Sequence, residues 1–276
     1  MIVDFRITLP GELIRRDVVE ARYLDNYNRI YRERGGAPSV DKLLDRMRAA
    51  GVERAVLQAE WAYGDYRQMN AAVNEIVKAN ADTLAGFLTV NPNEPDDMVA
   101  VADDASALGM KGINLQPFSY GVFANDRRFW PLYRRCQELG LIVSVHSSIN
   151  FSSTRPIRYG HPAQLDDIAC DFPDLRLVAN HGGWPWVLEM VAIAWKHKSV
   201  FIEIGAVSPK YIADTGTGWE PLMRYGNSLL QDQVLFATDC MLPFERAVSE
   251  AKQLPLKEEV KAKWLGGNAR RLLGWE

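Results

Sequence analysis

Short apolar runs rich in β-branched residues alternate with longer segments of helical periodicity along the whole chain. Runs of the first kind are typical of buried strands, and apolar residues spaced three or four apart are typical of amphipathic helices. Eight runs are predicted as strands, at 2–6, 54–59, 84–90, 111–116, 142–146, 176–180, 200–204 and 234–238. Helices are predicted at 40–50, 66–80, 98–108, 128–139, 162–170, 185–196 and 244–253. This alternation predicts an α/β fold with a parallel sheet.

Residues at the ends of these segments support the same pattern. Gly51 and Gly109 come just past predicted helices, and Ser39 and Asp126 stand just before them, as helix stop and start signals do. An open, doubly wound sheet would usually show a glycine-rich phosphate-binding turn after its first strand, and none follows Phe5. The eight strand–helix units therefore favour a single (β/α)8 TIM barrel, whose active site would lie at the C-terminal ends of the strands.

One long insertion interrupts the regular repeat. Residues 9–38, rich in Arg and Tyr, separate the first predicted strand from the first amphipathic helix. Long loops of this kind are often functional, so we expect the 9–38 insertion to cover the barrel mouth, with an oligomer contact as the alternative. No low-complexity linker or break in composition divides the chain, and 276 residues suit one barrel domain over 1–276.

Composition and charge exclude several classes of partner. The formal charge of −3 and the absence of a basic stripe argue against nucleic acid. No apolar stretch approaches the ~20 residues that span a bilayer, and the N-terminus lacks the features of a leader, so no membrane partner and a cytoplasmic location are expected. Cys136, Cys170 and Cys240 are too far apart for a structural zinc motif or a disulfide framework, and they are predicted to be buried reduced thiols.

Polar side chains end three of the predicted strands. His146 follows Val-Ser-Val, His181 follows Val-Ala-Asn, and Asp239 follows Leu-Phe-Ala-Thr. Because catalytic groups in a (β/α)8 barrel come from the ends of several strands, these three residues are predicted to form the catalytic centre. A histidine after a strand could also be a structural hydrogen-bonding group, but three such positions at one rim favour function.

Further polar residues stand in equivalent loops and are candidates for binding the substrate. Glu60, Asn91 and Gln116 follow the second, third and fourth predicted strands. Trp184 lies next to Gly183 in the loop after His181, where an indole could form a pocket wall, although packing against the barrel is the alternative. Arg155, in the Ser-rich loop after His146, could bind an anion.

These residues and their surroundings resemble the amidohydrolase superfamily, and within it the amidohydrolase-2 family, which contains aminocarboxymuconate-semialdehyde decarboxylase, resorcylate-type decarboxylases and several lactonases. The order and spacing of the matching stretches carry the resemblance over nearly the whole chain. They are Met1-Ile-Val-Asp4, Leu108-Gly-Met-Lys-Gly-Ile-Asn-Leu115, His146, Asn180-His181-Gly-Gly-Trp-Pro-Trp186, Leu235-Phe-Ala-Thr-Asp239 and Gly267-Asn-Ala-Arg-Arg-Leu-Leu-Gly274.

The resemblance implies roles for individual residues. In that family a His-x-His pair on the first strand, the fifth-strand histidine and the eighth-strand aspartate hold a divalent metal, and the sixth-strand histidine transfers a proton. His146 would then be a metal ligand, Asp239 a ligand or base, and His181 the acid or base. The first motif differs here, because the chain reads Asp4-Phe5-Arg6, with Asp4 and Arg6 on the same face of the strand.

Arg6 decides between two forms of the site. A guanidinium has only donors and stays protonated, so it cannot bind a cation, and two like charges 4 Å apart repel by roughly 4 kcal/mol at an effective dielectric of 20. In the metal-free form Arg6 replaces the cation and clamps a substrate carboxylate, with no cofactor. In the other, Asp4, His146 and Asp239 hold zinc or manganese as an open three-ligand site. A purely structural ion pair between Arg6 and Asp239 is a third alternative.

Three functional hypotheses follow. The first is an enzyme that hydrolyses or decarboxylates a small carboxylated cyclic or aromatic acid, a lactone hydrolase or decarboxylase, without metal. The second is a divalent-metal-dependent hydrolase that uses Asp4, His146 and Asp239. The third is a non-catalytic subunit paired with an active paralogue. The expected partners are a small carboxylate substrate and other copies of the chain in a homo-oligomer, or a paralogue in a hetero-oligomer.

Overall fold

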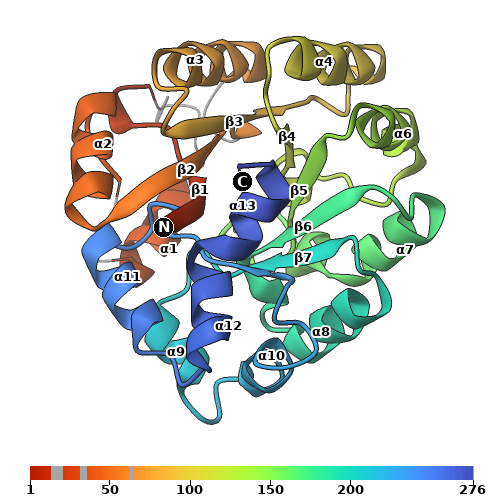
Figure 1. Cartoon of the computed structure of the whole chain (residues 1–276). Coiled ribbons are helices and arrows are strands. Elements are labelled where there is room, and N and C mark those ends of the chain that lie inside the picture. Colours follow the sequence, from red (N-terminus) through yellow and green to blue (C-terminus); the bar gives the residue numbers. More distant parts are fainter. Residues whose placement is uncertain (14–20, 32–35, 62–64, 276) are drawn as a thin grey trace.

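Eight parallel strands in sequence order form the centre of the molecule. The computed structural model describes residues 1–13, 21–31, 36–61 and 65–275. Each strand pairs in parallel with the next one along the chain, and helices surround the sheet (Figure 1). The strands are β1 (Ile2–Ile7), β2 (Val52–Gln58), β3 (Leu84–Thr89), β4 (Gly112–Leu115), β5 (Ile142–His146), β6 (Arg176–Asn180), β7 (Val200–Glu203) and β8 (Val234–Leu235).

Backbone hydrogen bonds bring the two edges of the sheet together. The amide of Phe5 donates to the carbonyl of Phe236 at 2.9 Å, and the amide of Asp239 donates to the carbonyl of Arg6 at 2.8 Å. The predicted single (β/α)8 TIM barrel is therefore confirmed. β8 ends at Leu235, short of the predicted 234–238, because the next amide, on Phe236, donates to the carbonyl of Trp264 at 3.0 Å, and the amide of Thr238 donates to the Asp4 carboxylate at 3.0 Å.

Seven long amphipathic helices match the predicted ones closely. Ser39 and Asp126 accept hydrogen bonds from backbone amides at the helix starts, as their positions predicted. The helix predicted from 185 begins two residues later, at Val187. The helices are α1 (Ala21–Ile30), α2 (Val40–Ala49), α3 (Tyr66–Ala79), α4 (Pro95–Ala107), α5 (Pro117–Tyr120), α6 (Trp130–Leu139), α7 (Ala163–Asp171), α8 (Val187–Lys196), α9 (Pro209–Ala213), α10 (Glu220–Gly226), α11 (Phe244–Lys252), α12 (Glu258–Ala262) and α13 (Asn268–Leu273).

Apolar side chains form two clusters, one outside and one inside the barrel. The larger cluster lies between the strands and the surrounding helices. The smaller one fills the barrel interior, where Phe5 and Phe87 meet edge to face with ring centroids 5.8 Å apart. Leu272 and Leu273 of α13 join the inner cluster, and α13 lies over the middle of the barrel in Figure 1. This packing closes one end of the barrel and leaves the strand C-termini at the other end for chemistry.

The described part of the 9–38 insertion contacts the loops after β5 and β7. Asn26 Nδ2 donates to the carbonyl of Phe151 at 3.1 Å, and the Tyr31 hydroxyl donates to the carbonyl of Ala206 at 2.9 Å. The rings of Tyr31 and Phe151 also meet edge to face. These contacts attach the insertion to the rim on which the strand-end residues stand, whereas residues 14–20 and 32–35 lie outside the described residues.

The burial of the three cysteines can be compared with the sequence expectation. Cys136 and Cys240 are buried as predicted, but Cys170 is exposed on α7, so the expectation of three buried thiols is wrong for that residue. The reason is that Cys170 falls on the solvent side of the helix, a placement that residue type alone does not reveal. Among the described helices, none has the length and apolar character needed to cross a membrane.

The inner cluster gives a test of the barrel core. Phe87 is fully buried, and its ring occupies the space that a Cβ at Gly112 would need. Phe87→Ala should lower the free energy of unfolding by about 3–5 kcal/mol, because it leaves a cavity inside the barrel. Denaturant unfolding followed by circular dichroism measures this loss. Leu188→Ala, at a side chain that is 64% exposed, is the control and should change it by less than about 0.5 kcal/mol.

Candidate active site

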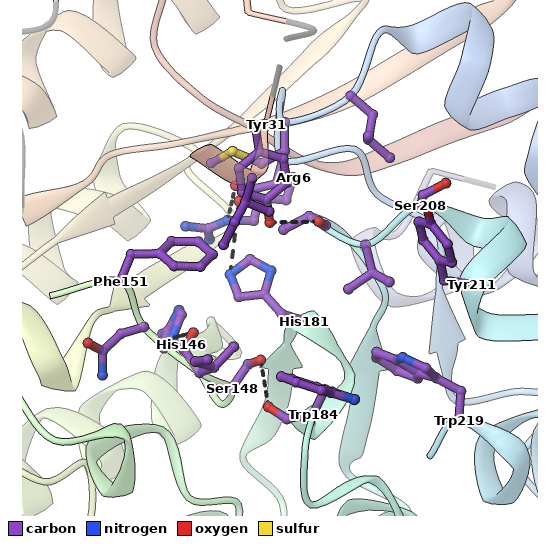
Figure 2. Close-up of a pocket in the computed structure, with 18 of the residues that line it drawn as sticks. Arg6, Tyr31, His146, Ser148, Phe151, His181, Trp184, Ser208, Tyr211 and Trp219 are labelled. Atoms are coloured by element: carbon purple, nitrogen blue, oxygen red, sulfur yellow. Dashed lines mark hydrogen bonds and ion pairs between the residues drawn. The ribbon is translucent and has the colours of Figure 1, made fainter. Parts of the chain in front are cut away.

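A cavity of about 910 Å³ opens at the C-terminal ends of the strands. Figure 2 shows its side chains, with Arg6 on one side, His146 and His181 in the middle, and Trp184, Trp219 and Tyr211 around them. The strand-end residues that line it are Arg6, Glu60, Gln116, His146, His181 and Asp239. Six different strands or the loops that follow them thus supply polar groups to one space. The sequence predicted three of these residues as catalytic and the other three as substrate-binding.

Arg6 is the centre of a buried polar network. Its side chain is 1% exposed, and its Nε donates to Asp239 Oδ1 at 2.6 Å while Nη2 donates to Glu60 Oε1 at 2.6 Å. Nη1 donates to Gln58 Oε1 at 2.7 Å and Asn114 Oδ1 at 3.2 Å. A guanidinium carries five N–H donors in a fixed plane, so these four bonds determine its orientation. One Nη2 hydrogen is left for a ligand among the described contacts, which is fewer than a bidentate clamp needs.

Asp4 lies beneath this network and does not reach the cavity. Its Oδ1 accepts hydrogen bonds from the amides of Arg6 and Thr238, and its Oδ2 accepts one from the Thr238 hydroxyl at 2.6 Å. The side chain is fully buried, and burial raises the pKa of this carboxyl to about 7. Asp4 therefore joins β1 to the segment after β8, which places Asp239 beside Arg6.

His181 presents one ring nitrogen to the cavity. Its Nδ1 lies 3.2 Å from the carbonyl of Gly205, which can only accept a hydrogen bond, so Nδ1 carries the hydrogen there. Its Nε2 lies 4.0 Å from Asp239 Oδ2. Burial, together with the charge of Arg6, lowers the pKa of His181 to about 3. His181 is therefore a neutral imidazole at physiological pH, with the Nε2 lone pair available to a ligand.

His146 stands beside His181 but makes different contacts. The two rings meet edge to face with centroids 4.9 Å apart, and Phe118 packs on the other side of His146. Its Nε2 lies 3.2 Å from the carbonyl of Ile149. Burial, followed by the neighbouring His181 and Arg6, holds the pKa of His146 well below its usual value. His146 is thus a second neutral imidazole in the floor of the cavity.

Glu203 is a site residue that the sequence analysis missed. It ends β7, its side chain is fully buried, and it lies behind His181, with Oε2 3.8 Å from Nδ1. Burial raises the pKa of Glu203 to about 8. The sequence did contain a signal for Glu203, because a glutamate interrupts the apolar run Val-Phe-Ile-Glu-Ile. Gln58 and Asn114 interrupt the apolar runs of their own strands in the same way. Buried polar residues need partners, so such interruptions indicate a polar network.

Residues at the strand ends adopt unusual backbone conformations. His181, Ala206, Asp239 and Cys240 have positive φ angles of 65°, 64°, 56° and 52°. Residues with a Cβ adopt this left-handed region rarely, at a cost of order 1–3 kcal/mol, and such residues cluster at functional sites. The buried hydrogen bonds to Arg6, Asp4 and Glu203 hold these segments in place.

The residues of the family's metal site do not fit a metal here. Both Asp4 oxygens are directed to Thr238 and the backbone, Asp239 Oδ1 is bound to the guanidinium, and His146 Nε2 faces a carbonyl. The positive charge of Arg6 stands among the three candidate ligands. Within the described part of the chain, the one close grouping of metal-binding residue types is Asp166, Cys170 and His197, on α7 and after α8. That grouping lies outside the cavity lining, and the Lys196 amine already contacts it.

The remaining predicted binding residues divide into two groups. Gln116 and Trp184 line the cavity; the Gln116 carboxamide oxygen is buried without a hydrogen-bond partner among the described residues, and Trp184 Nε1 donates to the Thr217 carbonyl at 3.1 Å. Asn91 and Arg155 are not part of the cavity lining. Asn91 donates to Glu94 in the turn before α4, and the exposed Arg155 packs against Gly121.

Comparison with protein families gives an independent assignment. The family model Amidohydro_2, described as Amidohydrolase, matches residues 16–275. The chain belongs to this amidohydrolase family. The family resemblance seen in the sequence is thereby confirmed. Among curated proteins, no sequence matches.

Solved structures with the same fold cover almost the whole chain. An uncharacterised TIM-barrel protein from Bordetella bronchiseptica has 28% identity and a TM-score of 0.83, covering 99% of this chain and 98% of its own. A 5-carboxyvanillate decarboxylase from Sphingomonas paucimobilis has 17% identity and a TM-score of 0.74, with the same coverage. A probable 2-pyrone-4,6-dicarboxylic acid hydrolase from Acinetobacter baumannii, with citric acid bound, has 14% identity and a TM-score of 0.72, covering 99% of each chain. The solved structures that share this fold thus include a decarboxylase and a probable hydrolase.

The raised pKa values of Asp4 and Glu203 predict how stability depends on pH. A carboxyl whose pKa is raised by folding stays protonated in the folded chain after the unfolded chain has released its proton, so stability falls as the pH rises towards the folded pKa. Between pH 6.5 and 8 the free energy of unfolding should fall, by up to about 1.4 kcal/mol per pH unit for each such proton. The lowered pKa values of His146 and His181 change the free energy of unfolding only below about pH 6.5, because above that pH the histidines are neutral in both the folded and the unfolded chain.

Denaturant unfolding at several pH values measures this dependence. Glu203→Gln should flatten the part of the curve between pH 7 and 8, which lies above the pKa of Asp4 but below that of Glu203. An unfolding free energy that is constant or rises with pH over this window would contradict the protonated state of the buried carboxyls.

Proposed function

We propose that the chain is an enzyme that hydrolyses a small carboxylated cyclic or aromatic acid in the strand-end cavity, without a metal ion. The main observation behind the proposal is that His181 Nε2 and Asp239 Oδ2 face each other at the cavity floor, 4.0 Å apart. This separation lets one bound water molecule hydrogen bond to both atoms at once. Neutral His181 can accept a proton from that water, which is the role of a general base.

The proposed reaction assigns one task to each group. His181 Nε2 takes a proton from water, the water oxygen attacks the ester or lactone carbonyl, and the C–O bond to the leaving oxygen breaks. The leaving oxygen then takes the proton from His181, which returns to its neutral form. Asp239 Oδ2 accepts a hydrogen bond from the second O–H of the water, whose hydrogen stays on the attacking oxygen, and so orients the water, because Oδ1 is fixed by Arg6 and Oδ2 faces His181.

The walls of the cavity suit a cyclic or aromatic substrate. Phe118, Phe151 and Trp184 line it beside the two histidines, and ring faces of this kind pack favourably on flat substrates. Arg6 can donate its remaining Nη2 hydrogen to a substrate oxygen, and its charge favours a carboxylate nearby. The buried Gln116 oxygen needs a donor, which a substrate hydroxyl would supply.

Decarboxylation is the second candidate, and one observation favours it. Burial raises the pKa of Asp239 above its ordinary value even beside Arg6, so this carboxyl can keep a proton. In that reaction the bond between the ring carbon and the carboxylate carbon breaks, carbon dioxide leaves, and the proton of Asp239 goes to the ring carbon. The 5-carboxyvanillate decarboxylase shares the fold and thereby supports this candidate at the level of architecture.

A substrate panel tests the proposal. Carboxylated lactones are assayed for ring opening by ultraviolet absorbance, and hydroxylated aromatic acids for release of carbon dioxide. For the substrate that is turned over, His181→Gln should lower kcat by about 10²–10⁴-fold, the usual contribution of a general base. His161→Gln is the matched control, because His161 lies outside the cavity lining and contacts Glu189, and its kcat should equal that of the parent. Full activity of His181→Gln refutes the proposal, as does a parent that is active only in a complex with a paralogue.

Metal removal tests the metal-free form of the site. Elemental analysis of protein purified without a metal-binding tag should find far less than one zinc or manganese ion per chain. Dialysis against a chelator should leave kcat unchanged. The reason is that the Arg6 guanidinium occupies the centre of the candidate ligand set. Loss of activity on chelation, restored by zinc or manganese, would instead establish a metal-dependent hydrolase.

A further inference from the structure

We propose that Glu203 is a positioning residue for His181, which holds the imidazole in the orientation that directs Nε2 into the cavity. This inference rests on the proposed function, in which His181 transfers the proton. No part of the family resemblance assigned a role to the end of β7, and Glu203 itself does not line the cavity. It would act entirely through the histidine in front of it.

The Glu203 carboxyl contacts His181 on the side away from the cavity. Its Oε2 accepts a hydrogen bond from the His181 backbone amide at 3.4 Å and lies 3.8 Å from Nδ1. Its Oε1 accepts a hydrogen bond from the Gly205 amide, and the Gly205 carbonyl in turn faces Nδ1 at 3.2 Å. One carboxyl therefore fixes both the backbone of His181 and the peptide group that sets its tautomer.

The local backbone is built around this carboxyl. A Cβ at Gly205 would come within 2.3 Å of Glu203 Oε1, so the absence of a side chain there lets the carboxyl lie flat against the loop. His181 has a φ angle of 65°, followed by Gly182 at 67° and Gly183 at 77°. A histidine in this conformation requires support from its surroundings, and the bond from its amide to Glu203 supplies it.

Charged groups on β1 and after β8 act on Glu203. The Arg6 guanidinium on β1 favours the ionised carboxylate, whereas Asp239 after β8 and Asp4 on β1 disfavour it, and burial disfavours it most. His181, after β6, is the neutral group that faces it directly. Glu203 therefore changes charge close to neutral pH, within 4 Å of the imidazole. Its ionised form attracts positive charge on His181 and makes Nε2 a stronger base.

The first experiment observes His181 itself and needs no substrate. Protein with ¹⁵N-labelled histidines is titrated from pH 6 to pH 9, and the His181 ring signals are assigned by their loss in His181→Gln. The parent should show a hydrogen on Nδ1 and a bare Nε2, with an inflection in both shifts near pH 8 as Glu203 ionises. Glu203→Gln should remove this inflection, because glutamine does not ionise. It should also give a mixture of His181 tautomers, because a hydrogen of the glutamine side-chain amide would then face the Nδ1 hydrogen. His181 signals that are the same in Glu203→Gln and the parent overturn the inference.

The second experiment measures turnover of the substrate found in the panel. Glu203→Gln should lower kcat by at least tenfold with little change in KM, and it should remove the rise of kcat between pH 7 and 9 that the parent shows. Glu258→Gln, at an exposed glutamate of α12, is the matched control and should leave kcat and its pH profile unchanged. Because Glu203→Gln could weaken folding, each variant is first compared with the parent by circular dichroism at the assay temperature.

The two experiments separate the failure of this inference from the failure of the proposed function. If the histidine signals respond to Glu203 but His181→Gln turns over substrate at the parent rate, Glu203 does position the imidazole and the proposed role of His181 is wrong. If His181→Gln is inactive but Glu203→Gln keeps the parent's kcat and pH profile, the function stands and the positioning role of Glu203 is refuted.

Discussion

The charge of Arg6, buried at the base of the cavity, is the constraint on which the rest of the site depends. A buried guanidinium is tolerated only when its donors find partners, and Asp239, Glu60, Gln58 and Asn114, from three different parts of the barrel, accept hydrogen bonds from it. Each of these side chains is therefore held in one orientation. The cavity floor is rigid because its polar groups have already formed their bonds to one another before a ligand arrives, and preorganisation of this kind favours catalysis.

The same charge gives the neighbouring titratable groups their character. Burial lowers the pKa of His181 and His146 most, and the charge of Arg6 adds to it, so two neutral imidazoles stand in a space lined by acids. Four carboxyl groups, on Asp4, Glu60, Glu203 and Asp239, surround one guanidinium, and burial raises the pKa of at least three of them. At neutral pH the Glu203 carboxyl, with its pKa of about 8, therefore keeps its proton while the two imidazoles stay neutral. This reversal of the usual order gives the site both proton acceptors and proton donors.

The fold and the rim residues could be predicted from the sequence to a large extent. The alternation of apolar runs and amphipathic segments gave the eight strands, because a buried parallel strand must be apolar along its whole length. His146, His181 and Asp239 stood out because each ends such a run. Asn91 and Arg155 show the limit of this reasoning: each follows a strand in the sequence, yet one completes a turn before α4 and the other lies against Gly121. Position after a strand does not set the direction of a side chain.

The sequence by itself determined that the chain is a (β/α)8 barrel of the amidohydrolase family and that Asp4 and Arg6 share one face of its first strand, since both depend on the order of residue types along the chain. Only the tertiary structure decided what Arg6 contacts, that Asp4 supports the loop after β8 instead of facing the cavity, and that Glu203 lies behind His181. These facts depend on pairs of residues that are far apart in the sequence, such as Arg6 and Asp239. Closure of the barrel brings them to within a hydrogen bond.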